Sequence, residues 1–271
     1  MRFINRHPGR GNQLLLALLP FILLLAAYFS GSAARLQDNS DDKLLPSAAQ
    51  MAAAIDRAAF REDRRSGEYI LWNDTAASLA RLGMGLGIAA CAGLALGIIS
   101  GAFPLLRAGL SPFLAVASMI PPLAILPILF IVFGLDELSK VMLIVIGITP
   151  ILARDLEQKA REIPRELFVK AQTLGANSWT LVLRMMLPQL CCRLFISLRL
   201  MLGPAWLFLI SAEAISATAG LGYRIFLVRR YLAMDTILPY VAWITLLAWL
   251  MDYLLRQINR RCFPWSEGAE T

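Results

Sequence analysis

Histidine is almost absent from this chain of 271 residues, which contains a single one, His7, in a basic N-terminal tail. A serine or cysteine nucleophile inside an apolar segment would therefore have no histidine to act as its base. Cysteine is also rare. Cys91, Cys191, Cys192 and Cys262 lie in or beside apolar stretches without C-x-x-C spacing, which argues against a disulfide framework and against a zinc site. We expect neither catalytic residues nor metal ligands.

Charged residues are scarce as well. They make up 17% of the chain, against about 25% in soluble domains, whereas 58% of the residues are hydrophobic and the mean hydropathy is +0.62. The net charge of +7 would suit a nucleic-acid partner, but several Lys and Arg residues flank long apolar runs, where they act as topology signals. The composition excludes a soluble enzyme and predicts no nucleic-acid partner. It indicates an all-α protein of the lipid bilayer, and we expect one domain over residues 1–271.

The apolar residues are gathered into runs that predict six transmembrane helices. The predicted spans are residues 14–29, 82–103, 110–133, 141–153, 194–215 and 236–255. The fourth run is shorter than the roughly 20 residues that a bilayer crossing needs, so we expect that helix to begin within residues 138–140.

The distribution of Lys and Arg predicts how these spans are oriented. Basic residues are in excess in segments 1–13, 104–108, 154–193 and 256–271, and are balanced by acidic residues in segments 31–80, 134–140 and 216–235. By the positive-inside rule both termini lie on the cytoplasmic side. Arg224, Arg229 and Arg230 are exceptions, because they fall outside. The first run is also compatible with a cleaved signal peptide, although an uncleaved span is favoured.

The long outer segment, residues 31–80, is interpreted as a solvated connector. Residues 38–42 have the composition of a loop. The alanine-rich stretch 47–60 predicts a short helix, which is a candidate for the outer membrane surface.

Small side chains recur every four residues in the second span, at Ala89, Gly93, Gly97 and Gly101. Such a strip lets another helix approach closely, because helices in lipid associate through van der Waals packing. The partner is either another helix of the same chain or a second subunit.

Proline interrupts the third span at Pro112, Pro121, Pro122 and Pro127. Each removes a backbone donor, and freed carbonyl groups at membrane depth are tolerated only inside protein or beside a wet cavity. The pair Pro121–Pro122 therefore predicts either a broken helix beside a pathway or a simple kink.

Two charged residues fall within the fifth span. Glu213 is a candidate for a transport pathway, since ionisable residues at membrane depth usually face a cavity or a partner; the alternative is a helix-end carboxylate bound by the outer loop. Arg199 is expected to extend to the inner interface, and Asp252 in the sixth span to lie at an interface.

The inner segment, residues 154–193, predicts a helix, a turn and a second helix. The first helix covers residues 165–174, and the second covers residues 179–186. The turn consists of Gly175, Ala176, Asn177 and Ser178. Gly175 suits a left-handed C-cap and Asn177 or Ser178 suits the next N-cap. The result is an elbow that presents Trp179, as helix-in-groove docking to a soluble partner requires.

This elbow resembles the cytoplasmic coupling motif of ABC importer permeases, which runs Glu-Ala-Ala, three residues, Gly, nine residues, Ile, one residue, Leu-Pro. The matching residues are Ala171, Gly175, Leu187 and Pro188, with Met185 at the Ile position. Val169 and Lys170 depart from the Glu and first Ala of the motif.

Further stretches resemble the nitrate, sulfonate and taurine group of these permeases. They are Leu44-Leu45-Pro46-Ser47, Pro121-Pro122-Leu123-Ala124-x-Leu126-Pro127, Phe133-Gly134-Leu135-x-Glu137-Leu138-Ser139-Lys140, Leu198-Arg199-x3-Gly203-x-Ala205-Trp206, Ala212-Glu213 and Gly220-Leu221-Gly222.

The resemblance implies a type I importer fold in a bacterial inner membrane. It implies a homodimer of permeases, two cytoplasmic ABC ATPase subunits and a periplasmic solute-binding protein. The absence of a G-x-x-x-x-G-K-[ST] loop fits a subunit that is not itself an enzyme, with ATP and Mg bound by its partner and no cofactor of its own.

The residues predicted to contact the ATPase are Ala171, Gly175, Ala176, Asn177, Ser178, Trp179, Leu187 and Pro188. The residues predicted to line the pathway are Met119, Pro121, Pro122, Trp206 and Glu213. The mechanism expected from the resemblance is alternating access driven by ATP.

Two other classes of function fit the sequence less well. An ion-coupled secondary transporter would leave the elbow unexplained and lacks a visible inverted repeat. An intramembrane enzyme lacks a convincing acid pair. For the solute, the resemblance points to sulfonates or nitrate, with Arg224, Arg229 and Arg230 attracting anions or docking the binding protein. The charged segment 31–80 favours instead a branch for urea, amide or guanidine-like compounds.

Overall fold

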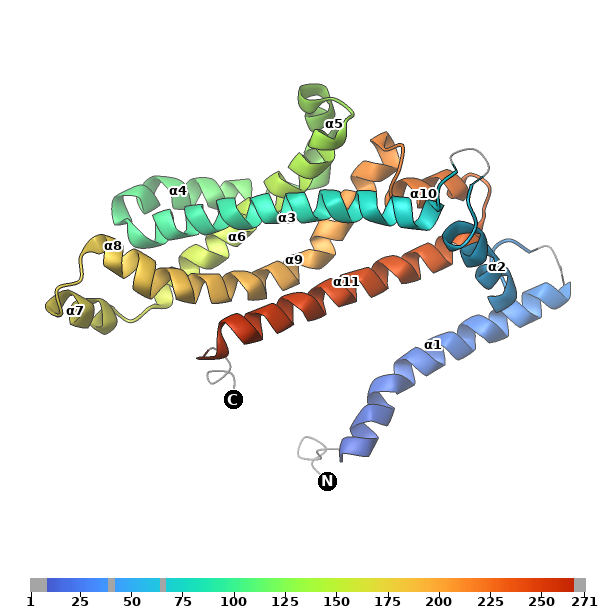
Figure 1. Cartoon of the computed structure of the whole chain (residues 1–271), viewed down its shortest axis with the longest axis horizontal. Coiled ribbons are helices and arrows are strands. Elements are labelled where there is room, and N and C mark those ends of the chain that lie inside the picture. The colour runs from blue at the N-terminus through green and yellow to red at the C-terminus, as the bar shows by residue number, and fades with distance from the viewer. Residues whose placement is uncertain (1–8, 39–41, 64–66, 266–271) are drawn as a thin grey trace. The chain divides into compact units, whose positions relative to one another are not determined.

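The computed structural model describes residues 9–38, 42–63 and 67–265, and within these ranges the chain is helical and contains no strand (Figure 1). The elements are α1 (Arg10–Asp38), α2 (Ala48–Ala59), α3 (Ile70–Ala102), α4 (Pro104–Ala117), α5 (Pro122–Phe133), α6 (Glu137–Glu162), α7 (Arg165–Thr173), α8 (Ser178–Thr180), the π-helical turn η2 (Leu181–Met186), α9 (Leu187–Ser216), α10 (Leu221–Arg229) and α11 (Met234–Cys262). His7 and residues 39–41 of the predicted loop lie outside the described residues.

The chain divides into two compact units. One comprises Met1–Tyr69 and Val228–Tyr240, and the other comprises Ile70–Leu227 and Val241–Thr271. The prediction of a single permease domain stays a prediction.

The first unit contains α1 and α2. None of the most apolar stretch of α1 is buried, as expected of a helix surrounded by lipid. A capping box begins α2: the Ser47 hydroxyl accepts from the Gln50 N–H at 3.2 Å, and the Gln50 side chain accepts from the Ser47 N–H at 2.7 Å. The Tyr28 hydroxyl donates to the Pro46 carbonyl at 2.8 Å, which ties α1 to the segment before α2.

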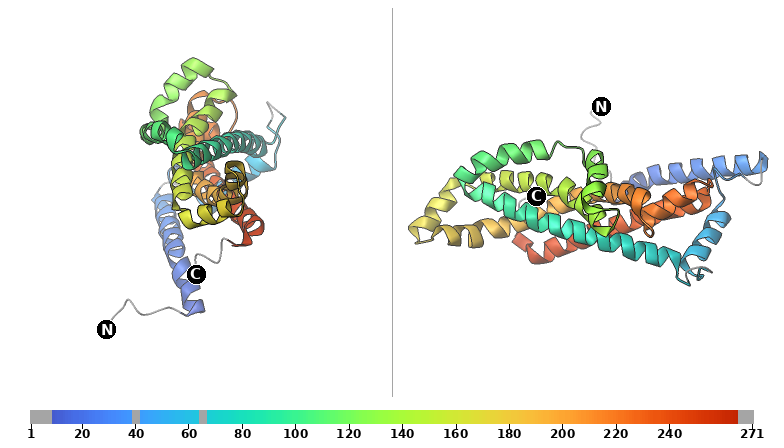
Figure 2. Two further views of the ribbon diagram at one scale, coloured as in Figure 1. Left: turned by 90° about the vertical axis from the view of Figure 1, so that its left-hand side faces the viewer. Right: turned by 90° about the horizontal axis from the view of Figure 1, so that it is seen from above.

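The second unit is built around the pair α3 and α6, which lie side by side (Figures 1 and 2). A Cβ atom at Gly97 would lie 2.6 Å from the Cβ of Leu156, and one at Gly101 would lie 2.5 Å from the Cβ of Ala160. Both distances are too short for non-bonded carbons, so the small strip of α3 serves packing within one chain. Of the two partners left open by the sequence, the helix of the same chain is the one in contact.

The third predicted span, residues 110–133, is not one continuous helix. It consists of α4 and α5, which are bent by 97° at the break. Pro121 and Pro122 have no N–H to continue the α4 ladder, and Pro121 is extended, with φ −66° and ψ 115°. Pro122 then occupies the first turn of α5, where a missing donor costs nothing.

Within the described residues, four stretches are long and apolar enough to cross a membrane, by length and composition: Gly11–Asp38, Ile70–Ala102, Ser178–Ser216 and Met234–Cys262. If the bent pair of α4 and α5 counts as one span, there are five. The prediction of an all-helical membrane protein is confirmed. The count of six spans stays a prediction, because α6 is not among these stretches and its second half, from Arg154 onwards, is rich in charge.

Candidate functional site

The predicted elbow begins where α7 ends. The backbone of Gly175 has φ +86°, a left-handed conformation that glycine adopts without a steric penalty. The Gly175 N–H donates to the Gln172 carbonyl at 2.9 Å, and the Ala176 N–H donates to the Ala171 carbonyl at 3.0 Å. These bonds close the C-terminus of α7.

The next helical segment is capped by Asn177. Its side-chain oxygen accepts from the Thr180 N–H and from the Thr180 hydroxyl, each at 2.8 Å. The chain then passes through α8 and η2 into α9. Pro188 has no N–H for the carbonyl four residues earlier, that of Arg184, which is consistent with the wider π-helical turn at this place.

Large apolar side chains of this elbow are exposed. Leu174 is 88% exposed and Trp179 is 69% exposed. Gly175, Asn177 and Ser178 are exposed as well, while Ala171, Ala176, Leu187 and Pro188 are half-buried. Leu174 and Trp179, which flank the turn, thus give the elbow an exposed apolar surface of the kind that docks a partner.

The five predicted pathway residues do not form one surface in this conformation. Met119, which is 75% exposed, lies with Pro121 and Pro122 at the break between α4 and α5. Trp206 and Glu213 lie in α9 and are 4% and 0% exposed. Their role in a pathway stays a prediction.

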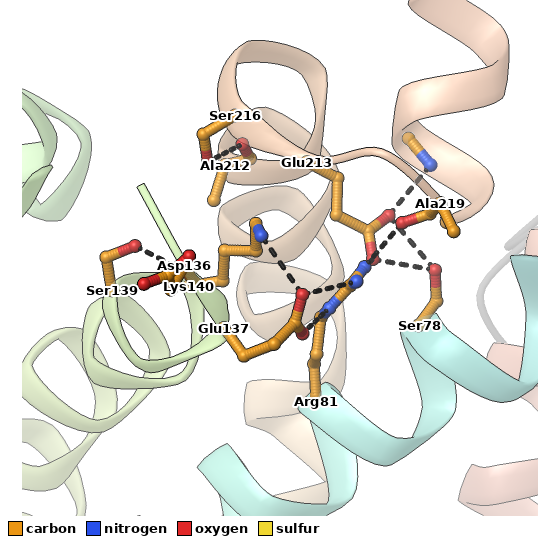
Figure 3. A network of polar contacts seen from close by, with 12 residues as sticks. Ser78, Arg81, Asp136, Glu137, Ser139, Lys140, Ala212, Glu213, Ser216 and Ala219 are labelled. Carbon is orange, nitrogen blue, oxygen red and sulfur yellow. Dashed lines mark hydrogen bonds and ion pairs between the residues drawn. The ribbon is translucent and has the colours of Figure 1, made fainter. Parts of the chain in front are cut away.

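The carboxylate of Glu213 is fully bound by neighbouring donors (Figure 3). The Ser78 hydroxyl donates to it at 2.8 Å, Arg81 Nη1 at 2.6 Å, and the Gly222 N–H at 2.9 Å. Gly220 must be a glycine here, because its φ is +135° and a Cβ would lie 2.6 Å from the Glu213 carboxyl carbon. Glu213 is thus a carboxylate near the end of α9 that is bound by α3 and by the first turn of α10, which is close to the alternative of a helix-end carboxylate bound by the outer loop.

Arg81 extends the network to α6. Its guanidinium forms a bidentate ion pair with Glu137, with Nη2 at 2.8 Å from Oε1 and Nε bound to Oε2, and it donates to the Ala219 carbonyl at 2.8 Å. Lys140, only 2% exposed, lies 3.2 Å from Glu137 Oε1. The network therefore holds together α3, α6, the end of α9 and the loop before α10.

A second ion pair lies beside it. Arg224 Nε donates to Asp74 Oδ2 at 2.8 Å, and the Gly220 N–H donates to Asp74 Oδ1 at 2.9 Å. Arg224 is therefore engaged within the fold, which weakens its predicted role in attracting anions or docking a partner. Arg199 likewise pairs with Asp252 at 2.7 Å, so two residues that were each expected at a membrane interface bind each other.

Asp74 and Ser78 were missed because segment 31–80 was interpreted as a connector, and Arg81 because the second span was predicted to begin at residue 82, whereas α3 begins at Ile70. Their spacing places them on one helix face, and that face continues through Ala89 and Gly93. The sequence signal that could have revealed these polar residues is that they continue the strip of small residues at the same helical spacing.

The sequence of this chain is similar to those of known transport proteins. Residues 93–264 match the model of the family "Binding-protein-dependent transport system inner membrane component". The chain is 35% identical over 195 residues to the taurine transport system permease protein TauC of Escherichia coli, covering 72% of this chain and 71% of that protein. It is 28% identical over 211 residues to the putative aliphatic sulfonates transport permease protein SsuC of Bacillus subtilis, covering 78% and 76%.

The fold is similar to that of a solved transporter. A chain of the MetNI methionine ABC transporter in an inward-facing conformation matches with a TM-score of 0.64 and 18% identity, over 74% of this chain and 99% of that chain. The predicted resemblance to the nitrate, sulfonate and taurine type is confirmed by these relatives. The chain belongs to the family of binding-protein-dependent transport system inner membrane components and is a multi-pass ABC transporter permease of the inner membrane.

Proposed function

We propose that this chain is the permease subunit of an ATP-driven importer for a small sulfonate such as taurine. The solute is handed over by a periplasmic binding protein and released into the cytoplasm. The 35% identity to a taurine permease over 72% of the chain supports this solute class, and the aliphatic sulfonate permeases support it too.

The observation that carries the proposal is the exposed elbow. Leu174 and Trp179, at 88% and 69% exposure, give it an apolar surface that is costly to leave in water. In the proposed complex this surface docks into a groove of a cytoplasmic ATPase subunit. Two copies of the chain, each with six spans and with both termini in the cytoplasm, carry two ATPase subunits.

The proposed mechanism is alternating access. Closure of the ATPase subunits on ATP moves the elbows, and each elbow continues through η2 into α9. The break between α4 and α5, with Met119, Pro121 and Pro122, is where the pathway is proposed to open and close, because a bend between two short helices changes with little loss of packing.

Replacement of the elbow tryptophan tests the coupling. Trp179→Ala should abolish most of the uptake of taurine into proteoliposomes that contain the permease, its ATPase and its binding protein, without lowering the amount of inserted permease. Trp265→Ala removes a similarly exposed tryptophan, at 61%, outside the elbow and should transport like the wild type. Normal uptake and normal ATPase stimulation in Trp179→Ala would contradict the assignment of the elbow.

The solute class is tested on the binding protein. Calorimetry with taurine, nitrate, urea and guanidinium in parallel should give tight binding for taurine. Tight binding of urea or guanidinium without taurine binding would refute the sulfonate proposal and favour the nitrogen-compound alternative.

A further inference from the structure

A polar cavity of about 590 Å³ lies between α4 and the second half of α6. Its volume is in the range of small-molecule sites. Ser111 and Ser118 line it from α4, and Arg154, Gln158 and Arg161 line it from α6. The three α6 residues recur at helical spacing and so project from one face.

The acidic groups of this cavity are already occupied. Asp155 is paired with Arg193, with Nη2 at 2.6 Å from Oδ1 and Nε at 2.8 Å from Oδ2, and it also accepts from the Ser197 hydroxyl. Glu157, which is 4% exposed, accepts from the Ser111 hydroxyl at 3.0 Å. With Arg193 included, three guanidinium groups face two carboxylates, and the local charge is positive.

The remaining arginines have donors to spare. Arg154 Nη1 donates to the Ser118 hydroxyl at 2.7 Å, which leaves most of its five N–H groups for a ligand. Within the described residues Arg161 makes no ion pair. Guanidinium groups bind tetrahedral oxyanions through parallel hydrogen bonds, and the Gln158 amide adds a neutral donor.

The position of the cavity relates it to the break between α4 and α5. Ser118 directly precedes Met119, so the polar cavity begins where the bent segment starts. A second cavity, of about 470 Å³, is lined mainly by apolar residues such as Phe113, Ile120 and Pro122. Of these two cavities, the polar one offers ligands for a charged solute.

We propose that Arg154, with Arg161, Ser118 and Gln158, forms an oxyanion site that holds the sulfonate group of the solute within the permease. This inference rests on the proposed function. A lipid phosphate presents the same tetrahedral oxyanion chemistry, and the experiment below separates the two sources.

The test uses the permease–ATPase complex in nanodiscs of phosphatidylcholine, without the binding protein, and measures equilibrium binding of radiolabelled taurine. Wild type should bind taurine weakly and saturably. Arg154→Gln and Arg161→Gln should each weaken binding on the order of tenfold, the effect of one lost hydrogen bond to a charged group. Arg256→Gln removes an exposed arginine of α11 outside the cavity and should bind like the wild type.

Three results would overturn the inference. One is wild-type affinity for taurine in both cavity variants. Another is the absence of taurine binding in a wild-type complex that does import taurine from its loaded binding protein. The third is a loss of co-purified phosphatidylglycerol in Arg154→Gln, measured by native mass spectrometry, with taurine binding unchanged; that result assigns the cavity to a lipid headgroup. Failure of the wild type to import taurine at all would instead refute the proposed function.

Discussion

We expect Arg81 and Glu213 to be energetically coupled, so that replacing both residues destabilises the permease by less than the sum of the two single replacements. We consider Arg81→Met and Glu213→Leu, apolar replacements of similar length, alone and combined. The Arg81 side chain is 5% exposed and that of Glu213 is 0% exposed, so removal of one partner leaves the other charge buried. Such losses cost about 3–5 kcal/mol in the free energy of unfolding.

The structure sets the order of the two single effects. After Glu213→Leu, Arg81 keeps Glu137 and the Ala219 carbonyl, which places this variant at the low end of the range. After Arg81→Met, Glu213 keeps only neutral donors, the Ser78 hydroxyl and the Gly222 N–H, which places that variant at the high end. Glu137, at 59% exposure and still paired with Lys140, remains solvated.

The double variant contains no uncompensated buried charge at this position. Its destabilisation should therefore fall short of the sum of the single effects by about 2–3 kcal/mol, a coupling energy typical of directly bonded groups. The assay is unfolding of the purified permease in mixed micelles titrated with sodium dodecyl sulfate, followed by tryptophan fluorescence.

The exposed pair Arg57–Asp235 is the control. Its charged atoms are 3.4 Å apart and its side chains are 59% and 30% exposed, so a cycle of Arg57→Met and Asp235→Asn should give a coupling of only about 0–1 kcal/mol. Additive effects at Arg81 and Glu213, within about 0.5 kcal/mol, would refute the view that these two buried charges stabilise the network by compensating each other.

The remaining predictions concern Gly97 and Gly175. Gly97→Ala should destabilise the permease by about 1–3 kcal/mol in the same assay, because its Cβ would lie 2.6 Å from that of Leu156. The control is Gly87→Ala, whose Cβ meets nothing within 4 Å and which should be neutral or stabilising by up to about 1 kcal/mol. Equal effects of the two replacements would contradict close packing of α3 on α6. Gly175→Ala should cost about 1–2 kcal/mol locally, because an alanine is strained at φ +86°, and should reduce taurine uptake while overall unfolding changes little. Unchanged uptake would show that the left-handed turn is dispensable.

Features that depend on local sequence were predictable. The strip at Gly93 and Gly97 predicted close helix packing from its spacing, and Pro121–Pro122 predicted an interruption. The short helix α2, which begins with the capping box of Ser47 and Gln50, lies near its expected bounds. In each case the physical cause lies within a few residues along the chain: a missing side chain, a missing donor, or a cap.

Features that depend on distant partners were not predictable. Asp74 and Arg81 ended the apolar run and so indicated a loop, yet both are buried because partners more than 50 residues away compensate their charges. The direction of the bend between α4 and α5, 97°, depends on what the two helices pack against. The second half of α6 is polar because it lines a cavity together with residues of α4. This polarity lowers the hydropathy of the helix, which is the property used to predict the span.

The packing of α6 suggests how the proposed motion would be divided. The Arg81 network joins the first half of α6 to α3, and the glycine contacts at Leu156 and Ala160 join its second half to α3, so we expect α3 and the whole of α6 to move as one body. The helix α6 ends at Glu162, three residues before α7, and Asp155 joins it to α9 through Arg193 and Ser197. Displacement of the elbow would therefore be absorbed at η2 and in the contact between α9 and Asp155, a residue that also lines the polar cavity. In the proposed importer, ATP-driven movement of the elbow would thus reach the site that holds the sulfonate group through Asp155.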